Sequence, residues 1–251
     1  MADANTLSVF VTALNEQANL EMAVAVVVAA AEQGFDDYEI FVFNDGSTDR
    51  TGEIADALAA GNPRVAAIHH RRPMNVGGCI REGLARARMH WSIQVDGKGA
   101  TTREALDRIF ALRRQADLVI PYTLNTDQRH RMRRIISRTY LMLVNTLFGL
   151  KMHYYGTGAL MLTALAQQFT IRTSSYAFNA EMIIKMVRNG CSYVEVGIED
   201  RFDNTGRRSK AFSWRNIKGV CAFVGRTFWD VYVARDYRRR TNEAPPAAAQ
   251  E

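Results

Sequence analysis

The chain has 251 residues, a formal net charge of +6 at pH 7 and a hydrophobic fraction of 47%. This composition excludes a disordered or collagen-like chain and provides enough apolar residues for a sizeable core. At about 100–200 residues per domain, the length fits one large domain or two small ones. The three cysteines, Cys79, Cys191 and Cys221, are too few and too scattered for a disulfide framework or a cysteine metal site. We therefore expect free thiols, packed in the core, in a reducing compartment.

We expect no segment of the chain to cross a membrane. The longest purely apolar run, 22–31, is bounded by Glu21 and Glu32, and a spanning helix needs about 20 such residues. The N-terminal residues lack the basic start and apolar stretch of a signal peptide. These observations predict a protein that is made and kept in the cytosol.

Short apolar runs alternate with longer helical patterns through the first half of the chain. Expected strands cover 7–13, 38–43, 64–68, 91–95 and 117–121, and expected helices cover 19–33, 48–60, 77–88 and 101–114. Asn19, Thr48 and either Thr101 or Thr102 are suited to cap three of these helices. Strands that alternate with helices of this length predict right-handed β-α-β units and a mostly parallel α/β sheet flanked by helices.

The second half of the chain has fewer expected strands. Helical patterns cover 129–149, 175–189 and 213–235, and one strand is expected at 192–198. Gly190 stands just past a helix end, where glycine is favoured. No linker separates the halves, so we expect a single domain over 1–240, with a C-terminal amphipathic helix at about 213–236 and a disordered tail over 241–251.

Polar clusters follow three of the expected strands at the point where each strand ends. They are Asn15-Glu16, Asn44-Asp45-Gly46 and Asp96-Gly97-Lys98. In such sheets the ligand binds outside the carboxyl ends of the strands. Asp45 at such an end is suited to accept hydrogen bonds from a nucleobase or ribose, with Gly46 allowing the turn, and Glu16 is suited to hold a ribose hydroxyl. The alternatives are that Asp45 or Thr48 only caps a helix and that Glu16 is a surface turn residue.

The order and spacing of four motifs resemble the family 2 glycosyltransferases. The motifs are Thr12-Ala13-Leu14-Asn15-Glu16, then Asn44-Asp45-Gly46-Ser47-Thr48-Asp49-Arg50-Thr51, then Asn75-Val76-Gly77-Gly78 with Glu82-Gly83-Leu84, then Val95-Asp96. The branch that looks most similar contains the dolichol-phosphate mannose synthases and bacterial polyprenyl-phosphate sugar transferases. The resemblance runs from about 7 to 211 and implies the GT-A fold, a nucleoside-diphosphate-sugar donor and inversion at the anomeric carbon.

The resemblance places the donor on the N-terminal motifs. The matching nucleotide-sugar-binding residues are Ala13, Asn15, Glu16, Asp45, Gly46, Ser47 and Asp96. Asp96 matches the first acid of the family's Asp-x-Asp motif, which holds a divalent ion on the donor diphosphate, but the second acid is replaced by Lys98. One carboxylate and an ammonium make a poor site for a hard cation such as Mg²⁺ or Mn²⁺. Metal on Asp96 and charge neutralisation by Lys98 are therefore two open interpretations, and a solvated Lys98 with weakened catalysis is a third.

Basic segments of the second half resemble the family's site for a lipid phosphate. The matching residues are Arg133, Ser137, Arg207, Arg208 and Lys210. Arg133 and Ser137 are spaced one helical turn apart, and guanidinium groups bind a phosphate in a bidentate manner. The alternative is that the arginine-rich run at 129–138 is a solvated face.

Two further features are open to more than one interpretation. Glu181 matches a recurring acid of the family, which implies that it faces the sugar or braces the acceptor arginines; a buried acid paired with arginine is the alternative. The loop at 69–72 contains His69 and His70 without an obvious partner, and we expect it to be solvated.

Together these features predict the transfer of a sugar from a nucleoside diphosphate to a polyprenyl phosphate of the dolichyl or undecaprenyl type. Because the acceptor phosphate is already anionic, it needs orientation more than a general base, and Asp96, Lys98 and Glu181 are the expected catalytic residues. We expect a peripheral enzyme on the inner face of the cytoplasmic membrane; a homo-oligomer is one open interpretation of its assembly. A nucleic-acid partner is not expected, because the aromatic platform for single strands is missing. The alternatives are a soluble family 2 transferase with a hydroxyl acceptor and a degenerate nucleotide-sugar-binding protein.

Overall fold

The computed structural model describes residues 5–125, 131–175, 177–201 and 222–234. The first part contains β1 (Thr6–Ala13), α1 (Leu20–Gly34), β2 (Asp37–Asn44), α2 (Thr51–Gly61), β3 (Val65–His69), α3 (Val76–Arg86), β4 (Trp91–Asp96), α4 (Arg103–Ala111) and β5 (Leu118–Thr123). The second part contains α5 (Arg131–Phe148), β6 (Leu160–Leu162), α6 (Thr163–Ala166), α7 (Phe178–Arg188), β7 (Tyr193–Ile198) and a C-terminal helix over 222–233, which ends in the π-helical turn η3 (Trp229–Val233).

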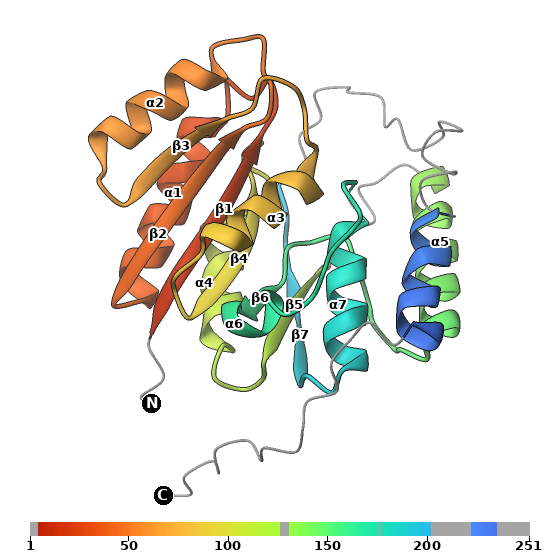
Figure 1. Cartoon of the computed structure of the whole chain (residues 1–251). Coiled ribbons are helices and arrows are strands. Elements are labelled where there is room, and N and C mark those ends of the chain that lie inside the picture. Colours follow the sequence, from red (N-terminus) through yellow and green to blue (C-terminus); the bar gives the residue numbers. More distant parts are fainter. Residues whose placement is uncertain (1–4, 126–130, 176, 202–221, 235–251) are drawn as a thin grey trace, which may run out of the picture.

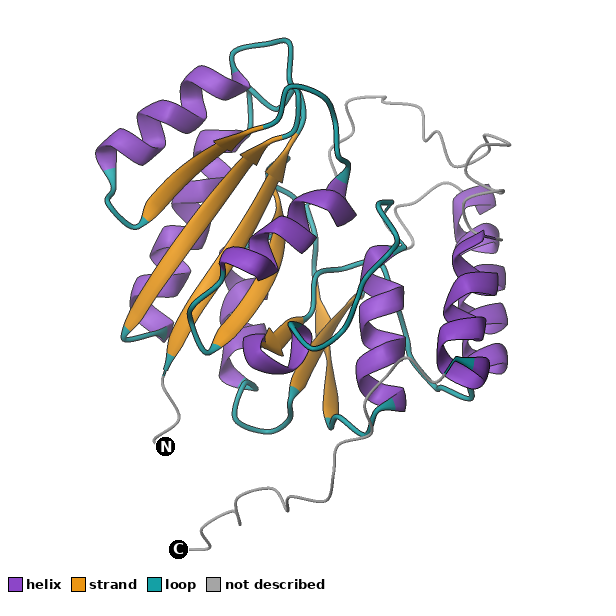
Figure 2. Ribbon diagram, viewed as in Figure 1, coloured by secondary structure: helices purple, strands orange, loops and turns teal. Residues whose placement is uncertain are grey.

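The strands form one seven-stranded sheet of order β3-β2-β1-β4-β6-β5-β7. All its pairings are parallel except those of the short β6, which runs antiparallel to β4 and β5. Figures 1 and 2 show the sheet between two layers of helices, with α3 and α7 in front of it and α1 and α4 behind it. This confirms the predicted α/β class and its mostly parallel sheet.

The two faces of the sheet carry separate apolar cores. On β1, Phe10 belongs to the cluster under α3 and α7, whereas Val9 and Val11 belong to the cluster under α1 and α4. Alternation of this kind follows from the two-residue period of a strand, and burial on both faces explains why β1 reads as a continuous apolar run. β1 lies between β2 and β4 in the sheet and contributes side chains to both cores.

Register places the predicted polar clusters at one edge of the sheet. Ala13 pairs with Asn44, and Thr12 pairs with Asp96, so β1, β2 and β4 end at the same level. The residues that directly follow these strands therefore lie around one rim.

Some element boundaries differ from the sequence prediction. Thr48 does not cap a helix, because α2 begins at Thr51 and the Thr48 backbone N–H donates to Asn15 Oδ1 instead. Thr102 does cap α4, since its side chain accepts a hydrogen bond from the Ala105 backbone N–H. Asn19 precedes α1 without a side-chain cap bond.

The strand β6 and the helix α6 were not predicted from the sequence, because elements of three and four residues are too short to show a hydrophobic period. Of the expected C-terminal helix, 222–233 is helical, whereas 213–221 and the tail at 241–251 lie outside the described residues. None of the helices in the described ranges combines the length and the apolar content that crossing a bilayer requires.

Candidate functional site

The loops that follow β1 and β2 are joined by reciprocal hydrogen bonds. The Asn15 backbone N–H donates to Ser47 Oγ at 3.0 Å, and Asn15 Oδ1 accepts from the Thr48 backbone N–H at 2.8 Å. Gly46 has a φ of +76°, and a Cβ there would lie 2.9 Å from Pro73, so only glycine fits this turn. The predicted residues Asn15, Gly46 and Ser47 therefore share one polar rim.

Glu16 is buried beside this rim, with 9% of the residue exposed. Its backbone N–H donates to Thr51 Oγ1 at 2.8 Å, and its Oε2 accepts from Asn19 Nδ2 at 2.8 Å. The alternative interpretation of Glu16 as a surface turn residue is wrong. Glu16 is a buried carboxylate beside the end of β1, and its expected contact with a ribose hydroxyl stays a prediction.

Asp45 is buried at the end of β2, where 5% of the residue is exposed. Its backbone N–H donates to the carbonyl of Ala13, the last residue of β1. Its Oδ1 accepts from the Met74 backbone N–H at 2.7 Å, and its Oδ2 accepts from the Asn75 backbone N–H at 2.8 Å. Asp45 therefore binds the loop before α3 and does not cap α2.

His70 connects Asp45 to α3. Its Nδ1 lies 2.8 Å from Asp45 Oδ1, and its Nε2 lies 2.9 Å from Glu82 Oε2. The other oxygen of Glu82, Oε1, pairs with Arg86 on the same helix. The His70 side chain is only 8% exposed, so the prediction of a solvated loop at 69–72 is wrong at this residue. Burial alone lowers the pKa of His70, but the hydrogen bonds to the Asp45 and Glu82 carboxylates outweigh it and raise the pKa above its usual range.

Cys79 lies against the same imidazole, with its Sγ 3.9 Å from His70 Nδ1. The possible ligand atoms of Asp45, His70 and Cys79 lie within 4.8 Å of one another, a spacing that a metal ion would also accept. However, burial and the nearby Asp45 charge raise the pKa of the Cys79 thiol to about 12, which opposes the thiolate that a metal binds. Both ring nitrogens of His70 also face carboxylates. Hydrogen bonding accounts for this cluster.

Asp96 and Lys98 form an ion pair at the end of β4. Asp96 Oδ2 lies 2.6 Å from Lys98 Nζ, and Asp96 Oδ1 accepts from Gln94 Nε2 at 2.9 Å. Lys98, at the sequence position of the family's second acid, thus places a cation against Asp96. Hard divalent ions take several oxygen ligands, so Asp96 and Lys98 in this arrangement do not fit Mg²⁺ or Mn²⁺.

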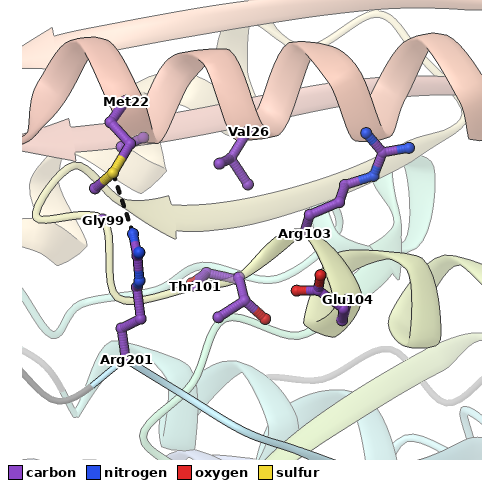
Figure 3. A pocket seen from close by; sticks show the side chains of 9 residues that line it. Met22, Val26, Gly99, Thr101, Arg103, Glu104 and Arg201 are labelled. Atoms are coloured by element: carbon purple, nitrogen blue, oxygen red, sulfur yellow. Dashed lines mark hydrogen bonds between the residues drawn. The ribbon is translucent and has the colours of Figure 1, made fainter.

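A pocket of about 250 Å³ opens beside this loop. Figure 3 shows Met22 of α1 on one side and Arg201 on the other, with Gly99 between them. Arg201 Nη1 lies 3.1 Å from Met22 Sδ. The pocket therefore joins the start of α1 to the chain that follows β7, next to the Asp96–Lys98 pair.

The two segments predicted to bind the acceptor leave the described fold from neighbouring points. The Arg201 backbone N–H donates to the Ala100 carbonyl at 2.8 Å, directly beside the loop that carries Lys98. Asn125 Nδ2 donates to the Asp200 carbonyl at 2.9 Å, and Thr123 Oγ1 donates to Asp200 Oδ2 at 2.9 Å. Asn125 and Arg201, the last described residues before 126–130 and before 202–221, therefore lie close to each other, and Arg201 lies close to the loop after β4.

The structure describes only part of the predicted acceptor site. Ser137 is half-buried on α5, which also includes the backbone of Arg133, so the two are one turn apart on the same helix. The side chain of Arg133 and the residues Arg207, Arg208 and Lys210 lie outside what the structure describes. Their predicted roles remain predictions.

Glu181 lies in a buried ion cluster at the start of α7. Lys185 Nζ lies 2.8 Å from both Glu181 Oε1 and Asp230 Oδ2, and all three side chains are at most 4% exposed. The Glu181 carboxylate also accepts from the backbone N–H groups of Arg172 and Thr173. The alternative of a buried, paired acid fits this geometry, except that the partner is lysine. The contacts of the Glu181 carboxylate are with protein groups, and its expected role at the sugar stays a prediction.

The family assignment follows from a direct match of the sequence. Residues 8–169 match the model of Glycosyl transferase family 2. The chain is a family 2 glycosyltransferase. The polar rim at the ends of β1, β2 and β4 falls within the matched segment, whereas Glu181 and the basic loop at 206–210 lie beyond it.

Two curated relatives are named as a glycosyltransferase and as a polyprenol monophosphomannose synthase. This glycosyltransferase is 27% identical over 248 residues to Glycosyltransferase AglD of Haloferax volcanii, in a match that covers 93% of this chain and 39% of AglD. It is 29% identical over 203 residues to the Polyprenol monophosphomannose synthase of Mycolicibacterium smegmatis, covering 76% of this chain and 75% of that protein. The chain thus spans well under half the length of AglD.

A solved structure has the same fold. Glucosyl-3-phosphoglycerate synthase from Mycobacterium tuberculosis, in complex with Mn²⁺, UDP and phosphoglyceric acid, superposes with a TM-score of 0.66 at 19% identity, covering 88% of this chain and 79% of that one. This likeness and the family match confirm the predicted GT-A fold.

Sequence reasoning missed His70 and the role of Glu82. Glu82 stood within a recognised motif, but nothing in the sequence pairs it with a histidine twelve residues earlier. The available signal was the position of His70 directly after β3, at the same end of the sheet as Asp45.

Proposed function

We propose that this glycosyltransferase moves a sugar from a nucleoside-diphosphate sugar to a polyprenyl phosphate, with inversion at the anomeric carbon. The observation that carries the proposal is the junction at Arg201, whose backbone binds Ala100 beside the Asp96–Lys98 loop. Arg201 lies five residues before the basic loop at 206–210, and this hydrogen bond holds it next to the polar rim. The names of the synthase from M. smegmatis and of the Undecaprenyl-phosphate mannosyltransferase of Micrococcus luteus, 29% identical over 173 residues, support the same acceptor class.

The donor nucleoside is proposed to bind across the ends of β1 and β2. Asp45 Oδ2 accepts one hydrogen bond in the described structure and has capacity for another, because each carboxylate oxygen has two lone pairs. Asn15, Ser47 and the buried Glu16 lie along the same rim, within reach of a base and a ribose.

The leaving diphosphate is proposed to be balanced by Lys98. Its ammonium lies 2.6 Å from Asp96 Oδ2 and its side chain is about half exposed, so Asp96 positions the charge at the rim. Lysine binds phosphate as a point charge, and a fixed cation at the leaving group stabilises the negative charge that develops there. The related glucosyl-3-phosphoglycerate synthase holds Mn²⁺ with UDP, and we propose that Lys98 supplies part of that charge in this chain.

The acceptor phosphate is proposed to meet Arg133, Ser137, Arg207, Arg208 and Lys210. One of its anionic oxygens attacks the anomeric carbon from the face opposite the diphosphate, the new carbon–oxygen bond forms as the bond to the diphosphate breaks, and the configuration inverts. A phosphate monoester needs no deprotonation for this attack, so orientation is the main contribution of the protein. The ion pair between Glu181 and Lys185 suits an acid that supports the α7 region rather than a general base.

Membrane attachment is proposed to use α5 and the C-terminal helix. Tyr232 Oη donates to the Leu147 carbonyl and its ring stacks on Phe148, so the two helices lie side by side. Their outer surface, which we call the outer apolar face, exposes large apolar side chains: Met132, Ile135, Met142, Leu143, Phe228, Trp229, Tyr232 and Val233. Arg138 and Arg226 are exposed on the same two helices. Aromatic, apolar and basic residues together suit an anionic membrane surface.

The proposal is tested by offering the purified chain a panel of UDP- and GDP-linked sugars with a polyprenyl phosphate. We expect a sugar-1-phosphate linked to the lipid as product. Parallel reactions with phosphoglycerate and with a simple alcohol test a soluble phosphate and a hydroxyl acceptor. Transfer to the alcohol alone would contradict the lipid-phosphate acceptor, and nucleotide binding without transfer to any acceptor would favour a degenerate binding protein.

A further inference from the structure

The histidine that bridges β2 and α3 is not explained by the transfer reaction itself. His70 has a carboxylate at each ring nitrogen: Asp45 at 2.8 Å on Nδ1 and Glu82 at 2.9 Å on Nε2. Ionised carboxylates only accept hydrogen bonds, whereas a neutral imidazole carries a single N–H. Both contacts are satisfied together only when the ring is the doubly protonated imidazolium.

Among the groups packed against His70, the two carboxylates favour the charged ring. Asp45 comes from the end of β2, and Glu82 and Cys79 come from α3. The thiol is uncharged because the pKa of Cys79 is raised to about 12. Arg86 is the other cation of the cluster, and it contacts only the far oxygen of Glu82, at 2.8 Å. The Phe43 ring covers the imidazole at 5.9 Å between centroids.

We propose that His70 is a positioning residue for the donor nucleotide: as an imidazolium between Asp45 and Glu82, it holds the Asp45 carboxylate in place where the base binds. This inference rests on the proposed function, since it assigns the base to Asp45. Asp45 lies at the carboxyl end of β2, where the base is proposed to bind. Glu82 binds the imidazolium from α3, and Arg86 binds Glu82 on the same helix. The chain Asp45–His70–Glu82–Arg86 thus alternates in charge from the rim to the exposed side of the helix.

Loss of the proton has a defined consequence. A neutral ring places a bare nitrogen lone pair against one of the two carboxylates, so either Asp45 or Glu82 loses its hydrogen bond from the imidazole. Asp45 is then held by the Met74 and Asn75 backbone N–H groups, shifts away from the repelling lone pair and binds the base less well. Nucleotide affinity is therefore highest on the acidic side of the His70 titration and falls as the pH rises through it.

Two variants separate charge from shape. His70→Gln keeps a polar side chain but has no titration, and Glu82→Gln keeps an oxygen for Nε2–H while removing one of the two charges that favour the imidazolium. His90→Gln is the matched control, because His90 directly precedes β4 and so lies at the amino ends of the strands, away from Asp45 at the carboxyl end of β2. We measure dissociation constants for UDP and GDP, and donor KM and kcat, from about pH 6 to about pH 9 for the full chain.

The expected result is a wild-type nucleotide affinity that weakens with rising pH by a single titration. His70→Gln weakens binding by about tenfold near neutral pH, the scale of a hydrogen bond to a charged group, and removes the pH dependence. Glu82→Gln moves the loss of affinity to lower pH, and His90→Gln behaves as wild type. These effects fall on the donor KM, with kcat changed little, because His70 acts on binding.

Several outcomes would overturn the inference. A wild-type protein that binds UDP or GDP with the same affinity across the range contradicts it alone, and so does His70→Gln with the wild-type profile. If His70→Gln fails to fold, ¹⁵N NMR of the wild-type histidine rings decides the matter, because a neutral His70 ring near neutral pH contradicts the bridge. A wild type that binds no nucleotide removes the proposed function as well, and this distinguishes the two failures.

Discussion

Lys98 is the residue at which this chain departs most clearly from the pattern of its family. Its ammonium lies 2.6 Å from Asp96, so activity is expected to survive a chelator. Lys98→Ala is expected to lower kcat by about 100-fold, because a preorganised charge at the leaving group is removed. Steady-state kinetics with and without EDTA measure both effects.

Two further variants interpret this result. Lys151→Ala removes an exposed lysine elsewhere and is expected to leave kcat unchanged. Lys98→Asp restores the family's second acid, and its activity is expected to become sensitive to EDTA and to return with Mn²⁺. Loss of wild-type activity in EDTA, with recovery on adding Mg²⁺ or Mn²⁺, would show that Lys98 does not replace the metal.

Asp45 determines which bases the donor site accepts, if the nucleoside binds as proposed. Its ionised carboxylate only accepts hydrogen bonds, so a base with a ring N–H is required at its edge. Uracil and guanine have this group, whereas cytosine and adenine present a lone pair there. UDP or GDP is therefore expected to raise the melting temperature more than CDP or ADP does, and Asp45→Asn is expected to remove the difference. Equal stabilisation by all four nucleotides would contradict this assignment.

At the scale of elements, the ion cluster of Lys185 joins α7 to the C-terminal helix. Lys185→Met leaves the buried carboxylates of Glu181 and Asp230 without their shared cation. Removing one partner of a buried ion pair typically costs about 3–5 kcal/mol, and we expect a loss of this size in the free energy of unfolding. Denaturation by urea, followed by circular dichroism, measures it.

Arg188→Met is the control on the same helix. Arg188 is exposed and lies over the Tyr232 ring at 5.5 Å from its centroid, a contact worth about 0.5–1 kcal/mol. A Lys185→Met protein as stable as Arg188→Met would contradict the structural role of the cluster.

The elements that could be predicted from the sequence are those whose signals are local. The apolar run of β1 is buried on both faces, and the Thr102 cap depends on a residue three positions away. The start of α2 could not be predicted in the same way, because the Thr48 backbone bonds to Asn15, 33 residues earlier.

The candidate site shows the same division. Asn15, Glu16, Asp45 and Asp96 were predictable because each lies within three residues of the end of an expected strand. The burial of His70 was not, since it depends on α3 packing over the end of β3 and bringing Glu82 to the ring. The third member of the Glu181–Lys185 cluster was equally hidden, because Asp230 joins the pair from 45 residues away.

At the scale of the whole molecule, the outer apolar face of α5 and the C-terminal helix predicts binding to vesicles that contain anionic lipid. Trp229 is 59% exposed, and burial of a large apolar side chain contributes roughly 1.5–3 kcal/mol. Trp229→Ala is therefore expected to lower the partition coefficient by about tenfold or more. Co-sedimentation with vesicles measures it.

Tyr193→Ala is the control for this surface. Tyr193 is 38% exposed but lies at the start of β7, outside the outer apolar face. Binding is also expected to weaken with salt, since the exposed arginines contribute through screened charge. A protein that ignores anionic vesicles, or whose binding is unchanged in Trp229→Ala, would exclude this surface as the attachment site.

The antiparallel strand β6 has a consequence for how the chain folds. β1, β2, β3 and β4 pair only with one another until β6 arrives, whereas β5 pairs only with β6 and β7 among the described strands. The N-terminal four strands can therefore assemble during synthesis while β5 waits for residues 160–162 and 193–198 to be made. Pulse-labelled hydrogen exchange is expected to protect the amides of β1 before those of β5, so the polar rim at the ends of β1, β2 and β4 forms before the C-terminal half of the sheet is in place.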